Sequence, residues 1–145
     1  MDIRLAQIED FEALAAMDSH LHPKTLMACI SLERVLVAEE NGVPKGLLRW
    51  NFFWDTIPFC NLLWVAEECR GKGIGSALLA AWEESRLAEG DPLLMTSTQA
   101  DETAQFFYRK RGYVVTGGFL PQGETYELLL EKRLTAAKEI KEENA

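Results

Sequence analysis

The sequence predicts a single α/β domain with a mostly antiparallel sheet and one parallel step. Its 145 residues match the length of one ordinary domain, and 48% of them are apolar, which is enough to bury a core without disulfides or metal ions. Residues 59–66, 73–88 and 93–97 predict a strand, a helix and a strand joined by short connections, the pattern of a parallel pair. Asn41-Gly42, between two apolar runs, predicts an antiparallel hairpin.

Seven strands are indicated by short runs that are apolar or that alternate apolar with polar residues. The run at 59–66 is apolar nearly throughout, which predicts a strand covered on both faces. In chain order, the predicted strands lie at residues 3–6, 34–39, 46–54, 59–66, 93–97, 113–117 and 126–130.

Four helices are indicated by apolar stripes and by residues that favour helix ends. The first begins near Ile8, and Pro23 suits the first turn of the second. Asp101 is placed to cap the fourth, and Gly112 stands where a left-handed residue would follow its end near residue 110. The third helix, at 73–88, is expected to bury one face formed by Ile74, Ala77, Leu78, Ala81 and Trp82.

The charge balance argues against nucleic-acid and membrane partners. Fifteen Lys and Arg residues against 23 Asp and Glu residues leave a net charge of −8, which disfavours attraction to phosphate backbones and anionic lipids. No apolar run approaches the span of a bilayer and no signal-peptide pattern is visible, so we expect a cytoplasmic protein. Three cysteines without CxxC spacing predict thiols and no metal site. Residues 1–133 form the predicted domain, and residues 134–145 a charged tail.

The most informative segment joins the fourth strand to the third helix. Its glycines let consecutive N–H groups turn inward, while a helix N-terminus and two cationic side chains add positive charge, so the segment predicts a pyrophosphate site. Tight packing between strand and helix is the alternative explanation of the same glycines. The segment consists of Arg70, Gly71, Lys72, Gly73, Ile74, Gly75 and Ser76.

Two better-known phosphate loops are excluded by the surrounding residues. A P-loop requires Ser or Thr directly after its Gly-Lys pair, whereas Lys72 is followed by Gly73. A dinucleotide fingerprint requires an acidic residue at the end of the next strand, where this chain has residues 96–99, Thr-Ser-Thr-Gln. The segment therefore predicts a different kind of phosphate site.

Two motifs resemble the GCN5-related N-acetyltransferase (GNAT) family. Arg70, Gly73 and Gly75 match its signature of Arg or Gln, two residues, Gly, one residue, and Gly or Ala. Leu63-Trp64-Val65 resembles the strand end before that signature, and residues 104–113 resemble the later segment that ends in Gly-Phe. The resemblance implies a mixed, twisted sheet of about six to seven strands with a parallel central pair and about four flanking helices.

The resemblance also implies a reaction, the transfer of an acetyl group from acetyl-CoA to a primary amine by direct attack in a ternary complex. It places the cofactor pyrophosphate on residues 70–76 and the pantetheine arm along Leu63, Trp64 and Val65. The Val65 N–H then becomes the donor to the thioester carbonyl. Tyr108 becomes the general acid and a cofactor contact, because a phenol stays protonated at neutral pH, while a core aromatic is its alternative role.

Other positions depart from the family pattern or leave alternatives open. Asp101 stands where many relatives carry an Asn that contacts the cofactor, which leaves helix capping as the favoured role. Asn61 stands where relatives often carry an acid, which leaves Glu67, Glu68 or a chain of waters as the base, and solvated surface charge is the alternative role of the two carboxylates. The residues expected near the acceptor are His22, Trp54, Asp55 and Asn61. Trp50, Phe52 and Trp54 alternate along a strand, which fits core packing equally well.

Three further functions are compatible with the sequence. One is a catalytically weak or inactive acyl-CoA-binding regulatory module of the same fold, and the others are a different nucleotide-binding enzyme and a structural protein. The expected partner is a small-molecule or peptide amine, whose identity the sequence does not reveal. Dimers are common in the resembled family, so a homodimer is one option.

Overall fold

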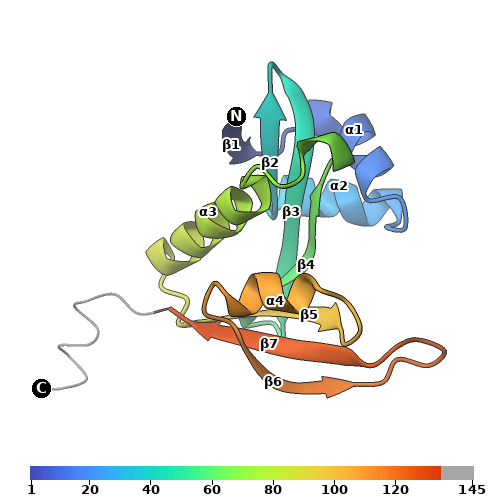
Figure 1. Cartoon of the computed structure of the whole chain (residues 1–145). Helices are drawn as coiled ribbons and strands as arrows, with labels where there is room; N and C mark the ends of the chain where they lie inside the picture. The colour runs from blue at the N-terminus through green and yellow to red at the C-terminus, as the bar shows by residue number, and fades with distance from the viewer. Residues whose placement is uncertain (135–145) are drawn as a thin grey trace, which may run out of the picture. The chain divides into compact units, whose positions relative to one another are not determined.

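A computed structural model describes residues 1–134, in which seven strands form one sheet in the order β1-β2-β3-β4-β5-β7-β6 (Figure 1). The strands are β1 (Asp2–Leu5), β2 (Val35–Glu40), β3 (Val43–Phe53), β4 (Ile57–Val65), β5 (Leu93–Gln99), β6 (Val114–Phe119) and β7 (Glu127–Arg133). The helices are α1 (Phe11–Met17), α2 (Pro23–Ser31), α3 (Ile74–Ala88) and α4 (Ala104–Arg109), with 3-10 turns η1 (Ile8–Asp10) and η2 (Glu67–Cys69).

The strand pairing confirms the predicted fold class. β1 and β2, β2 and β3, β5 and β7, and β6 and β7 pair antiparallel, whereas β4 and β5 pair parallel. The described chain divides into two compact units. The first is Met1–Asn51 with Asn61–Ser85, and the second is Phe52–Cys60 with the described residues from Arg86 to Leu134. Except for Leu134, the predicted charged tail lies outside the described residues.

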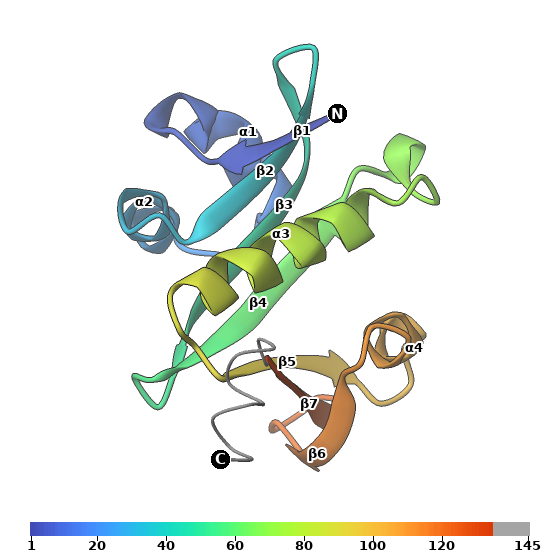
Figure 2. The same ribbon diagram turned by 90° about the vertical axis from the view of Figure 1, so that its left-hand side faces the viewer.

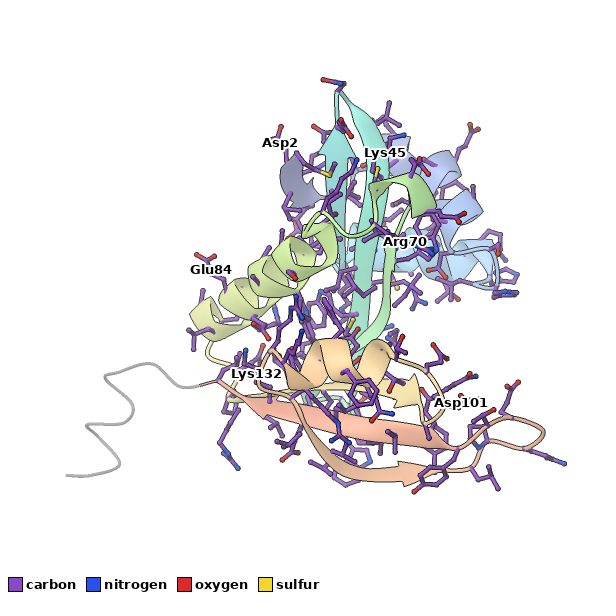
Figure 3. The ribbon with its side chains drawn as sticks, viewed as in Figure 1. Asp2, Lys45, Arg70, Glu84, Asp101 and Lys132 are labelled. Atoms are coloured by element: carbon purple, nitrogen blue, oxygen red, sulfur yellow. The ribbon has the colours of Figure 1, made fainter. Side chains whose placement is uncertain are left out.

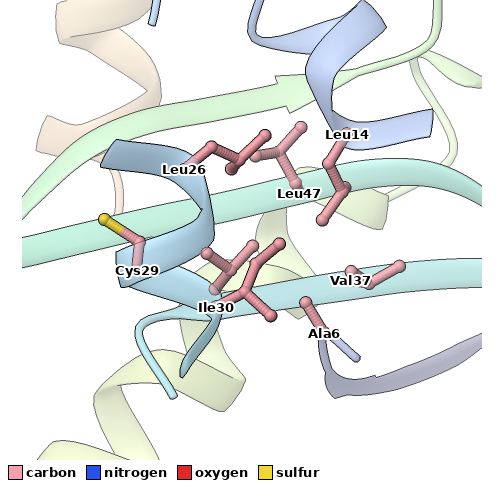
Figure 4. Packing of buried hydrophobic residues seen from close by; sticks show 8 residues of the cluster. Ala6, Leu14, Leu26, Cys29, Ile30, Val37 and Leu47 are labelled. Atoms are coloured by element: carbon pink, nitrogen blue, oxygen red, sulfur yellow. The ribbon is translucent and has the colours of Figure 1, made fainter. Parts of the chain in front are cut away.

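The core of the first unit lies between the sheet and the two N-terminal helices. Leu14 of α1 and Leu26 and Ile30 of α2 pack against Val37 and Leu47, and all five side chains are buried (Figure 4). Figure 2 shows α1 and α2 on one side of β2 and β3, and α3 on the other. Residues of β2 and β3 therefore alternate between two covered faces, as buried strands require.

Local backbone signals in the sequence are confirmed at several turns. Asn41 and Gly42 have φ of 52° and 80°, the left-handed pair that a tight hairpin requires. Pro23 occupies the first turn of α2, and Gly112, with φ of 93°, follows α4. The three cysteines are buried and form no disulfide. None of the helices in residues 1–134 has the length and apolar content needed to cross a membrane.

The predicted buried face of α3 is corrected at one position. Ile74, Leu78 and Trp82 are buried as expected and Ala81 is half-buried, but Ala77 is exposed and Leu79 is buried in its place. Successive helical residues are about 100° apart, so Leu79 lies on the Trp82 side of the stripe and Ala77 on the opposite side. The larger apolar side chain takes the covered position, because it removes more surface from water.

The predicted start of the fourth helix is wrong. α4 begins at Ala104 with Thr103 as its N-cap residue, so Asp101 lies too early to cap it and is exposed. A turn in which the Glu102 N–H donates to the Gln99 carbonyl at 3.1 Å delays the helix. Asp favours turns as well as helix N-caps, and here Asp101 lies in the turn before the helix.

One ion-pair network fixes the N-terminal strand to the segment that follows it. Arg4 donates to both carboxylate oxygens of Asp10, at 2.7 and 2.9 Å, and to Glu39 at 2.9 Å. The Gln7 N–H donates to Asp10 at 2.7 Å. Hydrogen bonding from Arg4 holds the pKa of Asp10 below its ordinary 3.8, burial opposes this shift, and the Gln7 N–H adds to it.

Asp10→Asn is therefore expected to lower the free energy of unfolding at neutral pH by about 1–3 kcal/mol. A carboxyl with a lowered native pKa stabilises the fold above pH 3.8, and this contribution is lost as the pH falls through the native pKa. The difference from wild type should thus shrink in acid, as measured by denaturant unfolding over a pH series. Asp2→Asn, at an exposed position of β1, is the matched control. Equal stability of D10N and wild type at neutral pH would contradict the role of this network.

Candidate functional site

The segment after β4 reverses the chain through two left-handed glycines. Gly71 has φ of 76° and Gly73 has φ of 81°. A Cβ atom built at either glycine would meet no atom within 4 Å. Close packing therefore does not account for these glycines, whereas a backbone conformation that L-residues rarely adopt does. Tight packing between strand and helix, the alternative explanation of the glycines, is therefore unsupported at both positions.

Main-chain amides gather where this segment enters α3. Among residues 1–134, no backbone hydrogen bond is donated by the N–H groups of Gly71, Lys72 or Gly73, and the Ala77 N–H donates to the Gly73 carbonyl at 3.0 Å. The first amides of a helix have no intrahelical acceptor and carry its positive partial charge. Lys72 and Arg70 are exposed beside them. The arrangement fits an anionic group such as a pyrophosphate.

Arg70 ties this segment to the end of β4. Its Nε donates to the Val65 carbonyl at 2.9 Å, and its guanidinium carbon lies 5.9 Å from the centroid of the Trp64 ring. The Ala66 N–H donates to the Lys45 carbonyl at 2.8 Å, which holds the same strand end against β3. Lys45 and Arg70 are labelled in Figure 3. The predicted cofactor residues of β4 and of the glycine segment thus form one connected part of the first unit.

The end of β4 differs from the fully covered strand that the sequence predicts. Pro58 and Cys60 are buried, but Asn61 is exposed and residues 62–65 are half-buried. In the described part of the chain, β5 pairs with β4 at Phe59↔Met95 and Cys60↔Thr96 and at no later residue. A strand that loses a neighbour partway along leaves main-chain groups available on that edge.

Gly46 was not identified from the sequence, although it supports this strand end. A Cβ atom there would lie 3.0 Å from the Trp64 carbonyl oxygen and 3.4 Å from Leu78. A glycine in the interior of a strand often marks such a close approach, but the predicted strand 46–54 begins at Gly46, whereas β3 begins at Val43 and places it inside.

The acidic residues after β4 are exposed. Glu67 and Glu68 lie in η2, and Glu68 is 3.5 Å from the Lys45 ammonium. Hydrogen bonding to its own main-chain amide lowers the pKa of Glu68, and the charge of Lys45 adds to the effect. Both carboxylates lie in a solvent-exposed turn, as expected if they are solvated surface charges, the alternative role given in the sequence analysis.

In the second unit, Tyr108 is buried, with 6% of its surface exposed. Its ring packs edge-on against Phe107 and Tyr113, with centroids 5.2 and 5.5 Å apart. Burial raises the pKa of the phenol well above its ordinary 10.0, and Cys60 raises it further, while hydrogen bonding with Thr96 lowers it. The hydroxyl is therefore protonated at neutral pH, as a general acid requires, and the ring is packed as a core aromatic would be.

The residues expected near the acceptor have identifiable local roles. The His22 ring caps α2, since its Nδ1 accepts from the Lys24 N–H at 3.1 Å. Trp54 and Asp55 form the turn between β3 and β4 with positive φ, and Trp54 is 78% exposed with its ring stacked on Phe53. Trp50 is buried and faces Trp82, so core packing holds for that member of the aromatic series.

A family model for the acetyltransferase (GNAT) domain matches residues 31–115. The chain belongs to the GNAT acetyltransferase family. The match includes both motifs of the predicted resemblance, which is confirmed. No curated protein sequence matches this GNAT chain. Membership supports acetyl-CoA as the cosubstrate, and the left-handed glycines, the amides and the two cations of the segment before α3 fit its pyrophosphate.

Solved structures share the fold of this GNAT domain at low sequence identity. Ard1 from Thermoplasma volcanium matches with a TM-score of 0.83 and 20% identity over 93% of this chain and 98% of that chain. Ribosomal-protein-alanine N-acetyltransferase from Brucella melitensis matches with a TM-score of 0.80 and 22% identity, over 92% of this chain and 100% of that chain. N-acetylglutamate synthase from Neisseria gonorrhoeae, complexed with coenzyme A and N-acetyl-glutamate, matches with a TM-score of 0.80 and 19% identity. The match covers 93% of this chain and 35% of that chain.

Gly46→Ala is expected to destabilise the protein by about 1–3 kcal/mol, because the added methyl group presses on the Trp64 carbonyl and displaces the end of β4. Gly117→Ala is the matched control, since Gly117 also lies in a strand but has no atom within 4 Å of its Cβ position. Thermal and denaturant unfolding measure both. Equal stability of the two variants would show that Gly46 does not hold the strand end.

Proposed function

We propose that residues 1–133 form one N-acetyltransferase domain that transfers the acetyl group of acetyl-CoA to a primary amine by direct attack in a ternary complex. The observation that carries the proposal is the left-handed glycine segment before α3, whose amides and flanking cations suit a diphosphate. Family membership supplies the reaction class.

The cofactor is proposed to lie along two adjoining pieces of the first unit. Residues 70–76 hold the pyrophosphate, and Leu63, Trp64 and Val65 hold the pantetheine arm. The Val65 N–H would then donate to the thioester oxygen as negative charge develops on it, where loss of one donor costs about 10²–10³ in rate. The hydrogen bond from Arg70 to the Val65 carbonyl supports this placement, because it connects the two pieces.

The chemical step is proposed to proceed through a tetrahedral intermediate. The amine nitrogen attacks the thioester carbon, the carbon–sulfur bond breaks, and the thiolate takes the proton of the Tyr108 hydroxyl, which then regains a proton from water. The nitrogen loses its proton to Glu67 or to water. Tyr108 is in its acid form at neutral pH, which a donor requires, while burial raises the pKa of the phenol and so opposes loss of its proton. Asp101, exposed in the turn before α4, is the further candidate for cofactor contact.

The acceptor is proposed to be a cationic or neutral amine that meets His22, Trp54, Asp55 and Asn61. The net charge of −8 favours the approach of a cation. The Brucella melitensis enzyme acts on a ribosomal-protein alanine and the Neisseria gonorrhoeae enzyme forms N-acetylglutamate, so a screen should include peptide N-termini, amino acids and polyamines.

The decisive experiment measures thiol release from acetyl-CoA with such a panel of amines, together with calorimetric titration of CoA, NAD and ATP. Release that depends on one amine, with CoA preferred over NAD and ATP, is the expected result. CoA binding without release on any acceptor would favour the regulatory module. Preference for NAD or ATP would overturn the proposal.

Gly73→Asp is expected to weaken CoA binding by at least about tenfold, because a carboxylate would stand beside the diphosphate. Gly90→Asp is the matched control, since Gly90 has a similar φ of 87° and equally open surroundings outside the segment. Calorimetry measures both affinities. Equal weakening in the two variants would assign the effect to backbone strain, and unchanged affinity in G73D would remove the segment as the anion site.

Tyr108→Phe is expected to lower kcat by about 10²-fold and to change the KM for acetyl-CoA little, because a positioned acid typically contributes at least that factor. Tyr113→Phe removes a hydroxyl from the neighbouring buried ring and serves as the control. Steady-state kinetics with the best amine separates the two parameters. An unchanged kcat in Y108F would leave Tyr108 as a core aromatic.

A further inference from the structure

An ion pair inside the first unit joins the end of α1 to β3. The Arg49 Nε donates to a carboxylate oxygen of Asp18 at 2.7 Å, and the two side chains are 11% and 8% exposed. Asp18 directly follows α1, and residues 19–22 lead from it to α2. The pair therefore fixes the start of the loop that carries His22, which is proposed to meet the acceptor.

The hydrogen-bonding capacity of this pair is only partly used. Within residues 1–134, the bond to Asp18 is the only one that the Arg49 side chain makes, so its two terminal nitrogens donate to no protein atom. The second carboxylate oxygen of Asp18 accepts no bond from the same residues. The buried side-chain atoms without a partner in this part of the chain are Trp82 Nε1 and Thr98 Oγ1, so the open atoms of the pair reach the surface.

Arg4 shows how a structural arginine of the same unit is bonded. It is 31% exposed, yet it donates to both oxygens of Asp10 and to Glu39. A buried ion pair recovers its desolvation cost only when its remaining donors and acceptors are also bonded. The Asp18–Arg49 pair is more buried and less completely bonded. It is therefore poorly suited to stabilising the fold and well suited to binding a polar group.

The pair lies on the face of the sheet that the end of β4 also presents. Leu47 belongs to the buried cluster formed with α1 and α2, and Leu62 and Trp64 of β4 pack against that cluster. Side chains alternate between the faces of a strand, so Arg49, two residues after Leu47, faces the same side. β3 and β4 are neighbours in the sheet. Arg49 therefore lies beside the strand that is proposed to hold the pantetheine arm.

We propose that Asp18 and Arg49 bind one peptide group of the acetyl acceptor. Its carbonyl oxygen accepts from the terminal nitrogens of Arg49, and its N–H donates to the open oxygen of Asp18. A free carboxylate has no N–H to donate and is repelled by Asp18, whereas an alkylammonium has no acceptor atom and is repelled by Arg49. The pair thus selects a peptide that carries a free amine. Its role as the acetyl acceptor rests on the proposed function.

Amide NMR titration tests this binding without turnover. The probes are alanyl-alaninamide, alanine and propylamine, each added to the full chain with excess CoA, which has no acetyl group to transfer. The dipeptide amide is expected to give saturable shifts at residues 18–22 and 48–50 and to bind at least about tenfold more tightly than the other two probes. Equal affinity for the three probes, or no shift at these amides, would overturn the proposal.

Arg49→Lys tests the terminal nitrogens themselves. Lysine keeps the positive charge opposite Asp18, but its single nitrogen leaves no planar fork beyond that contact. The variant should therefore fold, as judged by circular dichroism, and lose the preference for the dipeptide amide. Arg86→Gln is the matched control, because Arg86 forms a similarly covered ion pair with Asp91 in the second unit. It should keep the preference. A folded R49K protein that also keeps it would contradict the proposal.

Thiol release from acetyl-CoA with the same three probes separates this inference from the proposed function. Release with the dipeptide amide is expected, and R49K should raise the KM for that acceptor by at least about tenfold while the KM for acetyl-CoA changes little. Release with propylamine but not with the dipeptide amide would overturn the peptide assignment and leave acetyl transfer intact. Dipeptide binding that depends on Arg49, without release on any amine, would support the peptide site and contradict the proposed enzyme.

Discussion

The chain reversal between β4 and α3 is the constraint on which the rest of the site depends. Two residues of that reversal have positive φ, at Gly71 and Gly73, in a conformation that costs an ordinary L-residue free energy. The surroundings leave room for a side chain at both positions, so the backbone path and not crowding selects glycine. That path leads directly into α3, a 15-residue helix whose dipole places partial positive charge at this end.

The surrounding contacts explain how a segment with two glycines keeps a defined position. The Arg70 side chain returns to the Val65 carbonyl, the Ala66 amide bonds to Lys45, and Gly46 allows the Trp64 carbonyl to approach β3. Each contact acts on the strand end that precedes the segment. Since binding a diphosphate to preformed amides avoids the cost of ordering them, such rigidity favours affinity.

At the turns, predictions that depend on a few neighbouring residues were accurate. Asn41-Gly42, Pro23 and Gly112 each have a conformational preference that acts within one turn, and each lies where that preference requires. The start of α4 was wrong because Asp101 fits a turn as well as a cap, and Ala77 was misplaced because burial depends on what packs against α3. The burial of Tyr108 and the partial covering of β4 depend on residues distant in sequence, such as Thr96 and Met95, which periodicity does not identify.

Backbone amide NMR during titration with CoA tests the central claim most directly, because it observes the proposed donors themselves. The claim predicts saturable shifts that are largest at the amides of residues 71–76, with downfield movement of the proton resonances as they donate to phosphate oxygens. Saturable binding with those amides unmoved, or no binding of CoA, would contradict it.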